Sequence, residues 1–144
     1  MKTIRQLLDQ KGHSVWSIRP DGSVFDAVRL MAEKGVGALL VMDGERISGV
    51  ISERDYARKI ILKGRSSKDT HVREIMSSHV VYARPEQTLE EGMALMTDKR
   101  IRHLPVLDGP KLIGMVSIGD LVKAIIEEQK FVIAQLENYI TGSP

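Results

Sequence analysis

The hydrophobic and polar positions after Pro20 predict an amphipathic helix. Apolar residues recur there at i, i+3, i+4 and i+7, which gives the helix one apolar face to pack on a core. That face consists of Val24, Ala27, Val28 and Met31. Ser23 suits the N-cap position, and Gly35 suits the end of the helix.

Two short apolar runs with a turn between them follow this helix. The run Ala38–Met42 is continuous and apolar, as in a buried strand, and Asp43-Gly44 is a hairpin-type turn before a second strand at Ile47–Ile51. Ser52 then opens a second helix that continues through Leu62. We also expect a short strand before the first helix.

The whole pattern occurs a second time, 65 residues later and without gaps. The matched pairs include Pro20 with Pro85, Met31 with Met96, Asp43-Gly44 with Asp108-Gly109, Gly49 with Gly114, Ser52 with Ser117 and Asp55 with Asp120. Thr88 is the corresponding N-cap in the second copy. A shorter echo precedes each copy, since Ile4–Leu8 resembles Val72–Met76 at an offset of 68 residues. The chain is therefore an internal duplication.

The duplication predicts an α/β (α+β) fold in which each copy has a small sheet and two helices. One copy could not cover its own sheet, whereas two facing copies could, so we expect residues 1–144 to form a single module. Its predicted parts are a first repeat at 4–62, a polar linker at 63–71, a second repeat at 72–126 and an extended C-terminal helix at 127–142.

Composition excludes several classes of protein. There is no cysteine, which excludes disulfides, thiol nucleophiles and Cys-ligated metals. The net charge is +2 without a basic block, so nothing favours nucleic-acid binding. Charges interrupt the N-terminus too early for a signal peptide, and no segment approaches the roughly 20 apolar residues that span a bilayer. We expect a cytoplasmic protein that binds neither nucleic acid nor membrane.

The chain shows no recognisable catalytic or metal-binding pattern. The four histidines lack metal-ligand spacing; they are His13, His71, His79 and His103. The Gly-x-Gly at Gly35–Gly37 precedes a strand instead of following one, which excludes a dinucleotide-binding fingerprint. No catalytic triad, carboxylate pair or phosphate-binding loop is present. We therefore predict no enzyme, no catalytic cofactor and no metal.

Two segments carry a family resemblance. Gly49–Asp55 and Gly114–Asp120 both match the pattern Gly-apolar-x-Ser-x-x-Asp, and Arg102–Asp108 stands upstream of the second. With Val72–Met76 leading into the second repeat, the chain resembles the CBS-domain family from about Ile4 to about Ile126.

The resemblance implies a fold and a function. In that family, two tandem repeats pack about a pseudo-twofold axis as a Bateman module, with two clefts between them. The implied ligand is an adenine nucleotide such as AMP, ADP, ATP or NAD, with S-adenosylmethionine ranked behind these. The implied role is a regulatory sensor that acts on an unidentified partner protein, usually as a homodimer.

The two matched motifs provide the chemistry for a nucleotide. A carboxylate such as Asp55 or Asp120 can accept hydrogen bonds from both ribose hydroxyls. Ser52 and Ser117 stand three residues earlier, at a helix start, and can reach the ribose or a phosphate. The free N–H groups of that helical turn favour an anion.

The resemblance also implies that the two clefts are unequal. The phosphates of a ligand whose ribose is held by one copy are expected to meet the opposite copy. The matching positions differ: Arg102 and His103 face the Asp55 cleft, which also has Arg54, whereas Gly37 and Ala38 face the Asp120 cleft. In the Asp55 cleft, the backbone near Val80 is expected at the adenine edge, with Val50 packed on the base. In the Asp120 cleft, the backbone near Val15 is expected at the adenine edge, with Met115 packed on the base. We expect the Asp55 cleft to be the stronger site for a phosphate-bearing ligand.

Other interpretations of these residues stay open. Ser52-x-x-Asp55 and Ser117-x-x-Asp120 are also N-terminal capping signatures, and duplication would copy a cap as readily as a binding site. The whole protein could instead be a ligand-independent dimeric adaptor. A third alternative, an enzyme acting on nucleotides, lacks a nucleophile or metal set in the sequence.

The apolar pattern continues beyond the second repeat. Apolar residues follow helical spacing for several more turns; they are Leu121, Val122, Ile125, Ile126, Val132, Ile133, Leu136 and Ile140. An apolar face of this length needs a partner surface. We expect it to pack against the same helix, or the module, of a second chain, and the alternative is that it folds back on its own domain.

Overall fold

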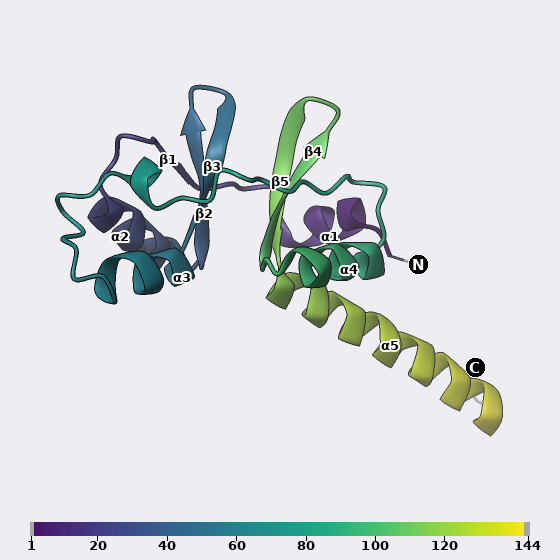
Figure 1. The fold of residues 1–144 in the computed structure, drawn as a ribbon. Coiled ribbons are helices and arrows are strands. Elements are labelled where there is room, and N and C mark those ends of the chain that lie inside the picture. Colours follow the sequence, from purple (N-terminus) through teal and green to yellow (C-terminus); the bar gives the residue numbers. More distant parts are fainter. Residues whose placement is uncertain (1, 143–144) are drawn as a thin grey trace. The chain divides into compact units, whose positions relative to one another are not determined.

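The computed structural model describes residues 2–142, which divide into two compact units. One unit is Val15–Val81, and the other combines the residues up to Ser14 with those from Tyr82 onward. Both units mix helices with a small sheet, as Figure 1 shows. The predicted α/β class with two similar repeats is therefore confirmed.

The unit Val15–Val81 is built on a three-stranded sheet in the order β1-β2-β3. The short strand β1 (Ser17–Ile18) runs parallel to β2 (Ala38–Asp43), which forms an antiparallel hairpin with β3 (Arg46–Ser52). Helix α2 (Val24–Lys34) and the helical segments after β3 pack on this sheet (Figure 1). Its core includes Val24, Ala27, Met31, Leu39, Val41 and Ile51.

Local sequence signals explain where α2 begins and ends. The Ser23 side chain accepts a hydrogen bond from the Asp26 N–H at the start, and Gly35 ends the helix in the left-handed conformation at φ 65°. Both predicted caps are confirmed.

The second helix of this unit changes its winding partway along. It begins as α3 (Glu53–Tyr56) and continues as a π-helical segment, η1 (Ala57–Ile61). The helix predicted through Leu62 therefore exists, but it is not a uniform α-helix. A π-helical turn closes hydrogen bonds between residues five apart, and hydrophobic periodicity does not detect it.

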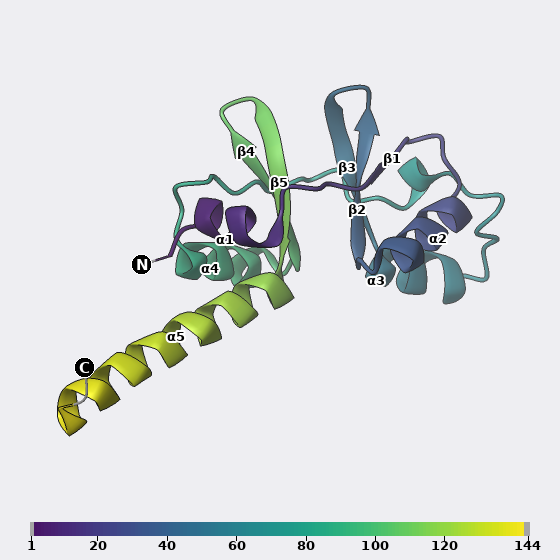
Figure 2. The same cartoon turned by 180° about the vertical axis from the view of Figure 1, so that it is seen from behind.

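The other unit repeats the hairpin and both helices. Helix α4 (Leu89–Lys99) precedes the antiparallel strands β4 (His103–Asp108) and β5 (Lys111–Ser117). Thr88 caps α4 as predicted, through a side-chain hydrogen bond from the Glu91 N–H. The final helix, α5 (Ile118–Thr141), is continuous over 24 residues, which confirms an extended C-terminal helix. Figure 2 shows these elements from behind.

The N-terminal helix α1 (Ile4–Lys11) belongs to the unit that contains the second repeat. The Ile4 and Arg5 N–H groups donate to the carbonyls of Gln87 and Pro85 at 2.9 and 3.0 Å. Leu8 is fully buried and lies under Gly114, where an added Cβ would stand 2.7 Å from a Leu8 methyl group. The helix is therefore an integral part of this core.

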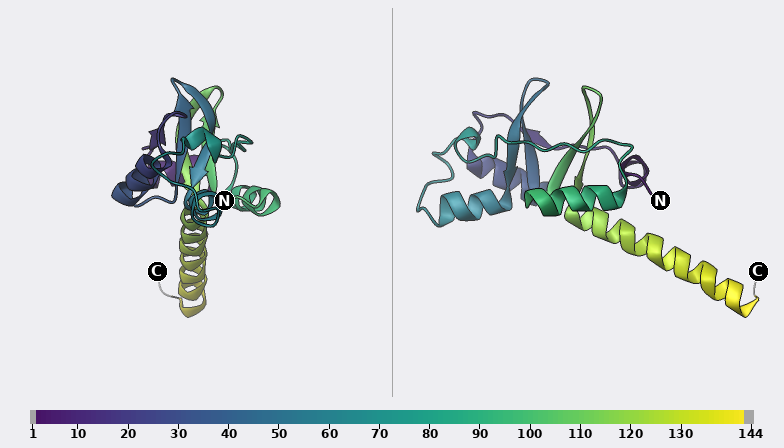
Figure 3. Two further views of the ribbon diagram at one scale, coloured as in Figure 1. Left: turned by 60° about the vertical axis from the view of Figure 1, so that its left-hand side comes forward. Right: turned by 45° about the vertical axis from the view of Figure 1, so that its right-hand side comes forward.

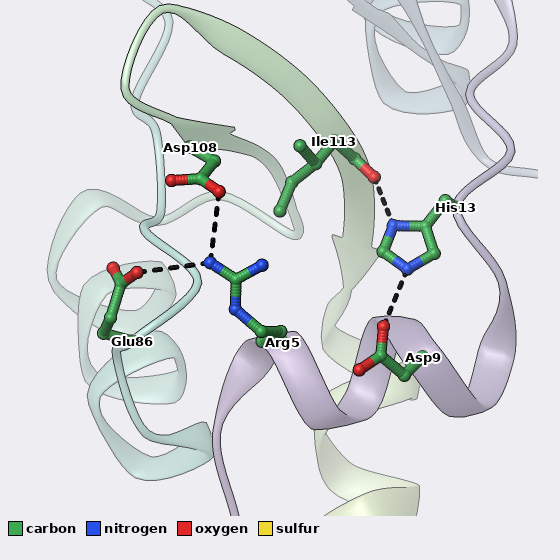
Figure 4. Close-up of polar contacts among 6 residues, drawn as sticks. All are labelled: Arg5, Asp9, His13, Glu86, Asp108 and Ile113. Atoms are coloured by element: carbon green, nitrogen blue, oxygen red, sulfur yellow. Dashed lines mark hydrogen bonds and ion pairs between the residues drawn. The ribbon is translucent and has the colours of Figure 1, made fainter.

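Polar side chains reinforce the position of α1 (Figure 4). Arg5 reaches Asp108 at 3.1 Å and Glu86 at 3.3 Å. Two residues beyond the end of α1, the His13 ring bridges Asp9 at 3.0 Å and the Ile113 carbonyl at 2.7 Å. Together these contacts bind α1 to the β4–β5 hairpin.

The echo segment Val72–Met76 plays the matching role in the unit Val15–Val81. It contains the 3-10 helix η2 (Val72–Glu74), and both Val72 and Ile75 join that unit's core. The Val72 N–H donates to the Gly22 carbonyl at 2.8 Å. Each unit therefore combines one repeat with the leading segment of the other repeat: Ile4–Leu8 packs with the second repeat, and Val72–Met76 packs with the first.

Candidate functional site

The site residues predicted from sequence fall into two sets, one in each unit. The unit Val15–Val81 contains Val15, Gly37, Ala38, Val50, Ser52, Arg54, Asp55 and Val80. The other unit contains Arg102, His103, Met115, Ser117 and Asp120. We call the surroundings of Ser52 and Asp55 the Asp55 half-site, and those of Ser117 and Asp120 the Asp120 half-site.

The Asp55 half-site is built on the start of α3. Ser52 is the N-cap: its hydroxyl accepts from the Asp55 N–H at 3.2 Å, and Asp55 Oδ2 accepts from the Ser52 N–H at 2.9 Å. Lys59, one turn further, places its Nζ 3.3 Å from Asp55 Oδ1 and donates to the Ile75 carbonyl at 2.8 Å. The Asp55 side chain is 18% exposed, so its carboxylate is mostly but not fully enclosed.

The Asp120 half-site repeats this cap at the start of α5. Asp120 Oδ2 accepts from the Ser117 N–H at 2.8 Å, and the Ser117 hydroxyl accepts from the Asp120 N–H at 3.1 Å. The cation here comes from a different element, because Lys11 of α1 places its Nζ 2.6 Å from Asp120 Oδ2. Lys11 also donates to the Met115 carbonyl at 2.9 Å. The carboxylate is thus bound more closely to a lysine than that of Asp55.

Lys11 and the Ser117 N–H stabilise the ionised form of Asp120. Burial by itself would raise the pKa of Asp120, but the hydrogen bonds from Lys11 and the Ser117 N–H, with the Lys11 charge, hold that pKa below its ordinary value. Asp120 is therefore ionised and paired at neutral pH.

Sequence reasoning missed Lys11. It lies more than 100 residues from Asp120 along the chain, ahead of the first repeat. The available signal was the echo between Ile4–Leu8 and Val72–Met76. The echo segments are offset by 68 residues, whereas the repeats are offset by 65 residues. Such a difference indicates that an echo segment can pack separately from the repeat that follows it in the sequence.

His103 lies next to Asp120 within its own unit. It begins β4 and pairs in register with Ser117 of β5. Burial lowers the pKa of His103, the Asp120 carboxylate acts in the opposite direction, and Lys11 and Arg102 lower the pKa further. The imidazole is therefore uncharged at neutral pH, and of the pair Arg102 and His103 only the arginine carries a positive charge.

The backbone around the two caps is duplicated even where the side chains differ. The Glu53 N–H donates to the Gly37 carbonyl at 3.0 Å, and the Ile118 N–H donates to the Arg102 carbonyl at 2.8 Å. The Arg102 side chain itself is exposed. A backbone hydrogen bond thus fixes the position of Arg102, while its guanidinium lies at the surface.

The residues expected near the base occupy half-buried positions. Val50 exchanges two backbone hydrogen bonds with Ser77, at 3.0 and 2.9 Å. Met115 is half-buried on β5, and Val15 and Val80 are half-buried near the two ends of their unit. Arg54 is exposed on the first turn of α3. The four residues expected near the base are therefore partly accessible, and Arg54 is exposed.

A cavity of about 230 Å³ opens beside Asp120 between α1 and α5. Its walls are formed by Leu7, Gln10, Lys11, Asp120, Lys123, Ala124 and Glu127. Two ammonium groups and two carboxylates thus meet at one opening. Solvent reaches the Lys11–Asp120 pair from this side.

The structure confirms the capping interpretation of both Ser-x-x-Asp motifs. In each, the serine and aspartate exchange backbone-to-side-chain hydrogen bonds that complete a capping box. Each carboxylate nevertheless retains some exposure, 18% at Asp55 and 28% at Asp120. A capping role is therefore present at both positions, and it leaves part of each carboxylate accessible.

Neither a metal cluster nor a membrane helix is present in the described part of the chain. Among residues 2–142, no three or more His, Asp or Glu side chains are grouped so that they could hold a metal ion. Within the same range, no helix combines the length and hydrophobicity needed to cross a membrane.

Comparison with known sequences identifies both repeats. The sequence model of the CBS domain matches residues 12–62 and again residues 72–127. The CBS domain-containing protein CBSX3, mitochondrial, of Arabidopsis thaliana is 43% identical over 97% of this chain and 72% of its own length.

Comparison with solved structures gives the same result. A CBS-domain protein from Burkholderia ambifaria MC40-6 is 54% identical, with a TM-score of 0.85 over 89% of this chain and 96% of that one. The CBS domain pair of protein MJ0100 was solved with 5-methylthioadenosine and S-adenosyl-L-methionine. It has a TM-score of 0.78 over 89% of this chain and 98% of that chain, at 18% identity, and thus shares the fold.

Proposed function

This chain belongs to the CBS-domain family, and from that premise we propose that it is a regulatory module whose two repeats bind an adenosine-containing nucleotide. The observation that carries the proposal is the pair of capped, partly accessible carboxylates, Asp55 and Asp120. An oriented carboxylate can accept both hydroxyls of a ribose in charge-assisted hydrogen bonds. The adenosine ligands bound to the MJ0100 domain pair support this class of ligand.

The proposed Asp55 site takes the more highly charged ligand. Ser52 and Asp55 hold the ribose, Arg54 and Arg102 supply positive charge for phosphates, and uncharged His103 supplies a hydrogen bond. Val50 and the backbone near Val80 contact the base. AMP, ADP, ATP and NAD fit this description better than S-adenosylmethionine, which carries a positive charge at sulfur.

The proposed Asp120 site uses Ser117 and Asp120 for the ribose, with Met115 and the backbone near Val15 for the base. Gly37 and Ala38 leave room there but supply no charge. Lys11 is the cation within reach of Asp120, at 2.6 Å. A ligand in this site must therefore displace or share Lys11.

The proposed mechanism is a population shift. A ligand held by residues of both repeats favours the arrangement that binds it, and a partner protein responds to that arrangement. We propose that the chain works as a cytoplasmic homodimer without catalytic activity of its own. Neither a nucleic acid nor a membrane is among its proposed partners.

Calorimetry tests the ligand proposal. AMP, ATP, NAD and S-adenosylmethionine are titrated in turn into the purified protein, and at least one adenine nucleotide should bind below millimolar concentration. Trp16 is the sole tryptophan and directly follows Val15, so its fluorescence gives a second signal. No binding by either readout would overturn the proposal.

Two substitutions test the assignment of the Asp55 site. Asp55→Asn should weaken adenosine and AMP alike, by about tenfold or more, because it removes a charged acceptor. Arg102→Ala should weaken AMP more than adenosine. Asp43→Asn, at the end of β2, is the matched control and should change neither affinity. An equal loss of adenosine and AMP in Arg102→Ala would contradict the placement of the phosphate.

The exposed apolar face of α5 favours one alternative, a ligand-independent dimeric adaptor. Ile133, Leu136 and Ile140 are all more than half exposed. A protein that keeps its dimer but binds none of the nucleotides would support this alternative over a sensor.

A further inference from the structure

The C-terminal half of α5 presents an apolar surface that its own unit does not cover. Figure 3 shows this helix extending past α4, which packs only on its first turns. Ala124 is the last fully buried residue of α5 in the described chain. Beyond it, Ile133 and Leu136 are 54% and 57% exposed, and Ile140 is 80% exposed.

These side chains follow a heptad repeat. The positions are spaced alternately by four and three residues, as in a coiled coil; they are Val122, Ile126, Gln129, Ile133, Leu136 and Ile140. Isoleucine occupies every a position, namely Ile126, Ile133 and Ile140. The d positions are Val122, Gln129 and Leu136, so one polar residue interrupts the seam.

The two flanks of this seam differ in chemistry. The g positions are apolar: Ile125, Val132 and Tyr139. The e positions are charged: Lys123, Lys130 and Glu137. Among residues 2–142, Lys130 and Glu137 form no ion pair.

This asymmetry favours one orientation of a paired helix. In a parallel pair, each g position lies against an e position of the other helix, so Val132 would face Glu137 of the second copy. In an antiparallel pair, g lies against g and e against e. Apolar residues then meet apolar residues on one flank, and charges meet charges on the other.

We infer that α5 pairs antiparallel with α5 of a second copy of this chain. The register that brings Lys130 beside Glu137 of the second copy also packs Ile133 against Leu136 and Val132 against Tyr139. The twofold symmetry of such a pair forms each of these contacts twice. Gln129 then lies opposite Ile140, where a polar side chain fixes the register at some cost in stability.

This pairing uses residues outside both half-sites. It therefore does not depend on ligand binding, and failure of the nucleotide proposal would leave it intact.

The first experiment measures the mass of the assembly by sedimentation equilibrium. Leu136→Lys should halve the mass at micromolar concentration, with at least a hundredfold weaker association. Phe131→Lys is the control: Phe131 is 65% exposed but occupies the outward f position, so its substitution should have no effect. An unchanged mass in Leu136→Lys, or equal dissociation in both variants, would overturn the inference. Because both residues are exposed, circular dichroism should show that both variants stay folded.

Charge reversal tests the e flank. Lys130→Glu should weaken association about tenfold by placing glutamates together, and Glu137→Lys should do the same with lysines. The double variant restores both opposite-charge pairs and should recover wild-type affinity. Failure of the double variant to recover would exclude this register.

Thiol cross-linking tests the orientation directly, since the chain has no native cysteine. Under oxidising conditions, an equal mixture of Ile133→Cys and Leu136→Cys chains should form a disulfide-linked dimer, because an antiparallel pair brings these positions together. Neither variant alone should cross-link efficiently. A parallel pair would give the reverse result, with each variant cross-linking to itself, and would refute the antiparallel arrangement.

Discussion

The Asp55 and Asp120 half-sites share a backbone and differ in the cation beside the carboxylate. Both begin a helix with the same serine–aspartate capping box. In one, Lys59 comes from the same helix and stands 3.3 Å away; in the other, Lys11 comes from α1 and stands 2.6 Å away. Duplication thus preserved the capping geometry. The positive charge beside Asp120 comes from α1, which precedes the first repeat, whereas the charge beside Asp55 comes from the repeat itself.

Gly49 and Gly114 likewise occupy matching backbone positions but have different neighbours. Each stands in the second strand of its hairpin, at matching positions of the repeat. An added Cβ at Gly49 would stand 2.5 Å from the Ser77 carbonyl oxygen, whereas at Gly114 it would meet Leu8 side-chain carbons at 2.7 and 2.9 Å. One glycine faces rigid backbone, and the other faces a side chain.

The largest predicted difference follows from these neighbours. Gly49→Ala should lower the free energy of unfolding by about 3 kcal/mol, because the added methyl must push apart the two hydrogen bonds between Val50 and Ser77. Gly114→Ala should cost about 1 kcal/mol, since Leu8 can adjust its rotamer. Urea unfolding of both variants measures the difference. Equal losses would mean that the two strands have equivalent neighbours, contrary to the contacts described.

Much of this architecture was predictable from sequence. The offset of 65 residues, the caps Ser23 and Thr88 and the hairpin strands all depend on local signals, and all appear in the structure. The lysine partner of Asp120 was not predictable in this way, unlike Lys59, which lies four residues after Asp55 on the same helix. Lys11 reaches Asp120 only because α1 packs against the second hairpin, and that contact is non-local. The π-helical turn of η1 likewise leaves no periodic signal.

The next prediction tests what Lys11 does to a ligand, and it depends on the proposed function. In an Asp55→Asn background, Lys11→Met should tighten adenosine binding at the Asp120 half-site by about tenfold, because the ribose no longer competes with an ammonium group. The gain for AMP should be smaller, since Lys11 can bind a phosphate after it releases Asp120. Calorimetry with both ligands measures the two gains.

Lys59→Met is the matched control for this prediction. In the same Asp55→Asn background it should leave the Asp120 half-site unchanged, because Lys59 contacts Asp55 and the Ile75 carbonyl. A loss of adenosine affinity in Lys11→Met would mean that the lysine organises the site instead of competing for it.

A smaller difference is expected where α2 and α4 end. Gly35 ends α2 at φ 65°, while the matching residue Arg100 ends α4 at φ 55°. A left-handed conformation is unfavourable for a residue with a Cβ, so Arg100→Gly should stabilise the protein by about 0.5–1 kcal/mol after allowing for the greater freedom of the unfolded chain. Thermal unfolding should show a rise of about 2 °C. Gly35→Ala is the inverse control and should lower the midpoint.

The smallest effect compares two histidines of one unit, His13 and His103. The hydrogen bond that His13 donates to Asp9, with that to the Ile113 carbonyl, raises the pKa of His13 above 6.5, while burial lowers the pKa of His103 below 6.5. Proton-detected NMR should therefore find the titration of His103 at lower pH than that of His13.

The two histidines should affect stability in opposite directions. The unfolded chain binds a proton at position 103 more readily than the folded chain, so the stability due to neutral His103 is complete above pH 6.5 and declines as the pH falls through the lower, folded-state pKa. For His13 the contribution is present below pH 6.5 and is lost as the pH rises through the raised pKa. His103→Gln should accordingly lose less stability than the wild type between pH 7 and pH 5, by under about 1 kcal/mol. A His103→Gln variant that is as acid-sensitive as the wild type would show that folding does not lower the pKa of His103.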